Sequence, residues 1–253
     1  MNKPERTTLD DLIASDARYY QASVARLGET AGIVDDINSA YDRLIDLIGQ
    51  STTADPAPLA TYFHLLMAGR YDFNMAAASA LRGQLTLSLQ ILRRGIDTAA
   101  TAWLIYRKPA LVGVWNKAAS DREAFAQWKT AARTPDLFPK DDTVVWPLYE
   151  RYEFCSRMVH ASLVSVGRRH TIARKDGQVQ MRAYYGEITD EDKTEPVRSL
   201  LYLVQTYTMI LSVFTQIYEQ HIGENRPSWD VRLNAIRARG LFEFERWHLR
   251  PAD

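Results

Sequence analysis

Apolar side chains recur every three or four residues along most of the chain, and this spacing predicts long α-helices. The clearest such stretches cover residues 7–27, 29–48, 59–82, 84–107, 146–166, 196–221 and 228–247. Residues that end helices stand between them, such as Gly28, Gly49 and the Lys108-Pro109 pair. We therefore expect an all-α fold in which amphipathic helices pack on one another as a bundle.

A connector at residues 51–58, which contains Pro56 and Pro58, interrupts this series of helices. We expect residues 1–55 to form an N-terminal arm of two antiparallel helices, and residues 56–253 to form the main bundle. An arm of this kind is a candidate for mediating assembly.

The periodicity changes near residues 170–185, where two extended runs flank Asp176-Gly177. Asp-Gly between two such runs is typical of a β-hairpin with a type I′ turn. Because two strands are marginally stable alone, we expect this small β-hairpin insertion to lean on the helices.

The composition narrows the functional classes. Hydrophobic residues at 46% and charged residues at 25% are ordinary for a globular protein. Lysine and arginine together number 31, as do aspartate and glutamate, so a polyanion partner would need a local basic patch. The single cysteine, Cys155, excludes an intramolecular disulfide. The N-terminal stretch is charged and lacks the apolar region of a secretion signal. Together with the single cysteine, this favours a cytoplasmic location.

Residues 199–218 carry no charge and are about long enough to cross a bilayer. Polar residues such as Gln205, Thr208 and Gln216 interrupt the stretch, which favours the central helix of a bundle, so we expect no membrane span.

The sequence has no phosphate-binding glycine loop, dinucleotide fingerprint, nucleophile elbow or paired zinc histidines. We accordingly expect no cofactor and no metal.

One polar line is a candidate catalytic site. Glu153, Arg157 and His160 stand at i, i+4 and i+7, so all three project from one helix face. An arginine beside a histidine can bind a phosphate and move a proton, as cleavage next to a ribose 2′-hydroxyl requires. The alternative is a structural Glu-Arg ion pair with a histidine satisfied inside the fold.

A second polar line is a candidate binding site. Gln90, Arg94 and Asp97 share the same spacing on a helix that is otherwise strongly apolar. Buried charges need partners, so Arg94 and Asp97 should each have one. If this face meets the one that carries Arg157 and His160, the polar groups would converge inside the bundle, either as a site or as a structural network.

Several short motifs carry a resemblance. The runs 80–84 and 92–97, followed by Tyr106, Pro109, Tyr152, Ser156 and His160, resemble a group of bacterial all-helical proteins that are similar to the HEPN superfamily. The resemblance spans roughly residues 59–222 and implies a helical bundle. The group carries an Arg-x-x-Glu pair; here Arg94 matches and Asp97 replaces the glutamate. Ribonuclease members separate arginine and histidine by four to six residues, whereas Arg157 and His160 have two between them.

Three hypotheses follow, and they leave open whether the protein is an enzyme. The first, suggested by the resemblance and by the polar line that ends at His160, is a HEPN-like bundle that binds or acts on RNA in a stress or defence context. The second is a non-enzymatic interaction or scaffold protein that forms a homo-oligomer. The third is a binder of a small anionic ligand held by Arg94, Arg157 and His160.

Overall fold

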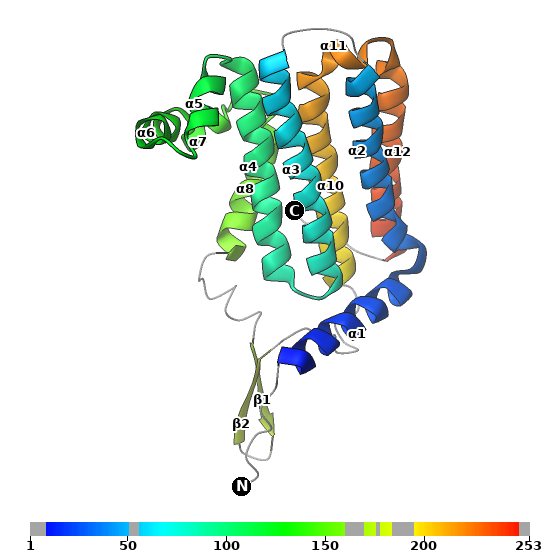
Figure 1. Ribbon diagram of the computed structural model, residues 1–253. Helices are drawn as coiled ribbons and strands as arrows, with labels where there is room; N and C mark the ends of the chain where they lie inside the picture. Colours follow the sequence, from blue (N-terminus) through cyan, green and yellow to red (C-terminus); the bar gives the residue numbers. More distant parts are fainter. Residues whose placement is uncertain (1–8, 51–55, 160–169, 176–177, 184–194, 248–253) are drawn as a thin grey trace.

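The computed structural model describes residues 9–50, 56–159, 170–175, 178–183 and 195–247 (Figure 1). Helices make up nearly all of this part of the chain, which confirms the all-α class and the helical bundle. The helices are α1 (Leu9–Leu27), α2 (Ile33–Gln50), α3 (Pro56–Leu81), α4 (Leu85–Arg107), α5 (Leu111–Lys117), α6 (Arg122–Ala131), α7 (Thr134–Leu137), α8 (Trp146–Val159), α10 (Glu195–Ile217), α11 (Glu219–Ile222) and α12 (Arg226–Arg246). Short 3-10 turns, η1 (Gly28–Gly32) and η3 (Gly223–Asn225), join α1 to α2 and α11 to α12.

Helix α10 lies at the centre of the bundle, against α2, α3, α4, α8 and α12 (Figure 1). Its apolar residues surround the helix, since Leu200, Leu201 and Leu203 point in three different directions and are all buried. Among the described helices it alone is long and apolar enough by composition to cross a membrane, and most of that stretch is covered by the other helices.

Helices α3 and α4 pack as an antiparallel pair, and the turn between them depends on Gly83. This glycine has φ +70°, a left-handed conformation that residues with a Cβ rarely adopt. A Cβ added to it would also stand 2.6 Å from the Tyr19 ring of α1. The break that the sequence predicts at Gly83 is therefore confirmed, and it is where α1 meets the bundle.

The two N-terminal helices do not form the expected antiparallel pair. Helix α1 lies across the end of the bundle (Figure 1), where the Gln84 side chain donates a 2.7 Å hydrogen bond to Asp16. Helix α2 instead buries Ile33, Tyr41 and Leu44 in the core shared with α10 and α12. Residues 51–55 lie outside the described residues, so the domain boundary at residue 55 stays a prediction.

Strands β1 (His170–Lys175) and β2 (Gln178–Ala183) pair antiparallel, with His170 opposite Ala183. The Asp176-Gly177 turn and the segments on both sides, 160–169 and 184–194, lie outside the described residues. The predicted turn type, and the packing of this insertion on the helices, therefore stay predictions.

Candidate functional site at the junction of α4, α8 and α10

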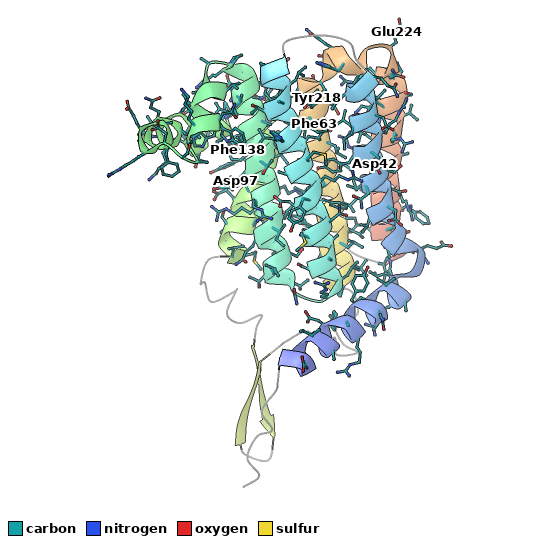
Figure 2. The ribbon with its side chains drawn as sticks, viewed as in Figure 1. Asp42, Phe63, Asp97, Phe138, Tyr218 and Glu224 are labelled. Atoms are coloured by element: carbon teal, nitrogen blue, oxygen red, sulfur yellow. The ribbon has the colours of Figure 1, made fainter. Side chains whose placement is uncertain are left out.

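Asp97 is the carboxyl group of this junction whose protonation is most changed by its surroundings. It lies one helical turn after Arg93 on α4, partly buried where α4 packs against α8 (Figure 2). Burial raises the pKa of Asp97 to about 6, and the nearby positive charge of Arg93 opposes that rise. A carboxyl group with a pKa near neutrality can exchange a proton under physiological conditions.

Arg93 joins α4 to α8. Its Nη2 donates a 2.9 Å hydrogen bond to the hydroxyl of Tyr152, and its guanidinium carbon lies 4.9 Å from the centroid of the same ring. The Tyr152 ring packs on Phe138 with centroids 5.2 Å apart, which holds the acceptor in place. Arg93 is thus fixed by a cation-π contact as well as by a hydrogen bond.

Two further arginines of α8 lie near the α10 residue Tyr202. The guanidinium carbon of Arg151 stands 4.6 Å from the centroid of the Tyr202 ring. Burial raises the pKa of Tyr202 to about 12, while Arg151 and Arg157 act to lower it. Arg157 itself is exposed. The junction therefore presents guanidinium groups beside tyrosine rings, with one of them accessible from solvent.

Cys155 lies between these arginines and is fully buried. Burial raises the pKa of the Cys155 thiol to about 12, against the smaller lowering effects of Arg151 and Arg93. A thiol in this environment stays protonated at neutral pH, whereas the thiolate is the reactive form. Cys155 is thus a packing residue of the junction rather than its nucleophile.

The two residues of the predicted binding pair, Arg94 and Asp97, lie against different helices. Arg94 Nε donates to both carboxylate oxygens of Asp72 on α3, at 2.9 and 3.0 Å, whereas Asp97 lies with Arg93 at α8. Residues four apart on a helix share a face more closely than residues three apart, which explains why Asp97 lies beside Arg93 and not beside Arg94. The engagement of Arg94 with Asp72 gives no support to a shared anion site formed with Arg157.

The predicted catalytic line is described only in part. Glu153 is partly exposed and Arg157 is exposed, both on α8. His160 lies outside the described residues, so the expected Arg157 and His160 pair stays a prediction.

Sequence reasoning did not identify Arg93, Tyr152 or Asp72 as site residues, although Tyr152 and the run that contains Arg93 belong to the motifs of the resemblance. One signal for Asp72 was present, since it is the only acidic residue in the mainly apolar helix α3. A lone carboxylate in such a helix must be exposed or paired, and here it is 3% exposed and ion-paired.

Asp97→Asn is expected to stabilise the protein at neutral and higher pH. A carboxyl pKa raised in the folded state means that the folded protein gives up its proton less readily than the unfolded chain. The associated stability is complete below the ordinary value of 3.8 and is lost as pH rises through about 6. At about pH 8 the amide should therefore raise the free energy of unfolding by about 2 kcal/mol.

Urea unfolding of the wild type and of Asp97→Asn at about pH 8 and about pH 3.5 measures this difference. The stabilisation should be present at the higher pH and nearly absent at the lower one. Equal effects at both values would show that burial of the carboxylate is not its cause.

Comparison with known proteins does not assign this arrangement. No family model, no curated protein and no solved structure matches the chain.

Proposed function

We propose that the protein is a non-enzymatic interaction protein that associates with a second copy of itself through the outward face of α12. The observation that carries this proposal is an apolar stripe on the side of α12 that points away from the core. The stripe consists of Val231, Ala235, Ala238 and Phe242, all exposed. Val231 is 70% exposed and Phe242 is 60% exposed.

The spacing of the stripe residues along α12 shows that they do not pack in the core of this bundle. Intervals of four, three and four residues place its members on one helix face. The buried residues of α12, which include Trp229, Leu233 and Ile236, belong to the opposite face. A helix that packs on a core normally turns polar residues to water. Helix α2 does so, since its exposed face carries Asp35, Asp42 and Asp46.

The order of side-chain sizes along the stripe favours a second copy as the partner. A bulky residue stands at each end, and two alanines stand between them. Two antiparallel α12 helices would place Val231 opposite Phe242 of the other copy, and Ala235 opposite Ala238. The alanines would let the two backbones approach closely. Such a self-complementary patch is what a two-fold symmetric interface requires.

Helix α3 carries a second exposed apolar stripe, which is a candidate surface for further contacts with partner proteins. Met67, Tyr71 and Met75 stand at i, i+4 and i+8 and are 38%, 60% and 38% exposed. Exposed apolar residues that gather on one face are typical of interaction surfaces, and methionine suits contacts that must adapt in shape.

Replacing both bulky residues, Val231→Glu with Phe242→Glu, is expected to abolish association. The wild type should sediment with twice the chain mass of 28.9 kDa, and the variant with that mass itself. Burying a carboxylate in an apolar contact costs several kcal/mol, which exceeds what a short helix pair supplies.

Asp46→Lys on the exposed face of α2 is the matched control. It changes surface charge without touching the stripe and should leave the sedimenting mass unchanged. A wild type that stays monomeric across the micromolar range, or a control that dissociates equally, contradicts the proposal. Circular dichroism establishes that each variant remains helical.

A second candidate function, RNA binding, is favoured by the arginine and tyrosine groups of the α4, α8 and α10 junction. Guanidinium groups bind phosphates, and aromatic rings stack on bases. Arg157→Gln should weaken binding of a single-stranded RNA by roughly tenfold, the effect of losing about 1.4 kcal/mol. Fluorescence anisotropy at low salt measures this. Arg122→Gln, on exposed α6, should bind as the wild type does.

RNA cleavage, the stronger form of this candidate, requires His160. A HEPN-like ribonuclease would degrade the RNA and lose that activity in His160→Ala. Intact RNA after incubation with the wild type would remove the cleavage hypothesis, and identical affinities of wild type and Arg157→Gln would remove RNA binding at this junction. Both candidate functions are proposed for the cytoplasm, because a single cysteine suits a reducing compartment.

A further inference from the structure

Several buried tyrosine hydroxyls have no hydrogen-bond partner within the described part of the chain, and two of them, on α2 and α10, lie near the same buried carboxylate. Tyr41 of α2 and Tyr207 of α10 are both 0% exposed, and neither hydroxyl oxygen is bonded. A hydroxyl buried without a partner is costly, and buried polar groups in folded proteins are almost always satisfied by protein or by ordered water. Each hydroxyl is therefore either bonded to a group that the protein atoms do not supply or left unpaired, and its surroundings decide between the two.

Both hydroxyls lie close to glycines of α3 and α4. A Cβ added to Gly69 would stand 3.4 Å from the Tyr41 hydroxyl oxygen, and one added to Gly95 would stand 2.4 Å from that of Tyr207. Both phenols thus reach close to the backbones of α3 and α4. The Tyr207 ring is held there by Phe73, whose centroid lies 4.9 Å away.

Asp72 supplies a carboxylate to the same region. It is 3% exposed and follows Gly69 by one turn of α3, while its partner Arg94 directly precedes Gly95 on α4. Burial raises the pKa of Tyr41 and of Tyr207, and the negative charge of Asp72 raises both further. Asp72 therefore lies within electrostatic reach of both hydroxyls, although it bonds to neither.

We infer that the core between α2, α3, α4 and α10 contains a binding site for ordered water formed by Tyr41, Tyr207 and Asp72. A buried water needs two to four polar partners. Here the phenol O–H groups donate to the water oxygen, and the water donates its hydrogens to the carboxylate. Arg94 already neutralises Asp72 from the surface side, so a neutral ligand fits the site better than a metal cation or an ammonium group. This inference is independent of the proposed self-association.

Single tyrosine-to-phenylalanine variants distinguish a hydrated site from two orphaned hydroxyls. If water is bound, Tyr41→Phe and Tyr207→Phe each remove one of its partners. Each should then lower the midpoint of thermal unfolding by about 2–4 °C. The double variant should lose less than the sum of the two, because both act on the same water. If the hydroxyls are merely unpaired, removing them should leave the midpoint unchanged or raise it.

Tyr218→Phe is the matched control. The Tyr218 hydroxyl is also buried without a partner in the described residues, but its raised pKa comes from burial and from Tyr62, with no carboxylate among the causes. The control should leave the midpoint unchanged or raise it. A nuclear Overhauser effect between bound water and the slowly exchanging hydroxyl protons should appear in the wild type. Unchanged or raised midpoints for Tyr41→Phe and Tyr207→Phe, an equal loss in the control, or no contact with water would each overturn the inference.

Discussion

Arg94→Ala is expected to lower the free energy of unfolding by about 3 kcal/mol, the lower end of the range for breaking a buried ion pair. The Asp72 side chain is 4% exposed, and Arg94 satisfies both of its oxygens. Removing the guanidinium leaves a buried carboxylate without its counter-charge. The Arg94 side chain is 60% exposed, so water entering from the surface should limit the loss.

Urea unfolding at neutral pH measures this effect, and two further variants separate its causes. Arg94→Ala combined with Asp72→Asn should recover most of the lost stability, since the remaining buried group is then neutral. Lys108→Ala breaks an ion pair with Asp136 in which both side chains are well exposed, and should cost less than about 1 kcal/mol. Equal losses for Arg94→Ala and Lys108→Ala would show that the buried pair has no special role.

Gly95→Ala is expected to destabilise the protein by about 2–3 kcal/mol through overpacking. The added Cβ would stand 2.4 Å from the Tyr207 hydroxyl oxygen and 3.1 Å from the ring carbon that carries it. The Tyr207 ring is fully buried against Phe73, so it cannot swing aside as a flexible side chain could. The close approach of α4 to α10 at this point therefore requires glycine.

A second glycine serves as the control for Gly95→Ala, and a second substitution at Tyr207 tests the cause of the lost stability. Gly113→Ala in α5 adds a Cβ with no atom within 4 Å and should be neutral or stabilise by up to about 1 kcal/mol. Adding Tyr207→Phe to Gly95→Ala removes the nearest clashing atom and should restore part of the loss. A Gly95→Ala protein as stable as Gly113→Ala would contradict the packing described for α4 and α10.

Sequence periodicity predicted the long helices well because each carries an apolar stripe over several turns. The helix expected at 84–107 spans Leu85–Arg107, and the one expected at 196–221 spans Glu195–Ile217 before a short break. It did not predict the direction of α1, because that depends on contacts of Asp16 and Tyr19 with the α3–α4 turn. No local pattern encodes such contacts.

The site was harder to predict for a related reason. Helix α4 buries residues on most of its circumference, so the pattern did not show which arginine turns toward α8. Arg93 and Arg94 are adjacent in sequence but bind Tyr152 and Asp72 on different helices. The outward stripe of α12 escaped notice because a helix that is apolar on two opposite sides has a weakened periodicity.

The central claim is that a second copy of the chain covers the α12 stripe in antiparallel orientation. Disulfide trapping in a mixture of Ala235→Cys and Ala238→Cys proteins tests it most directly. The account predicts rapid formation of a cross-linked dimer in the mixture, since those positions face each other, with Cys155 buried and inert. Asp46→Cys, exposed on α2, should cross-link only slowly. A mixture that cross-links no faster than Asp46→Cys would contradict the account.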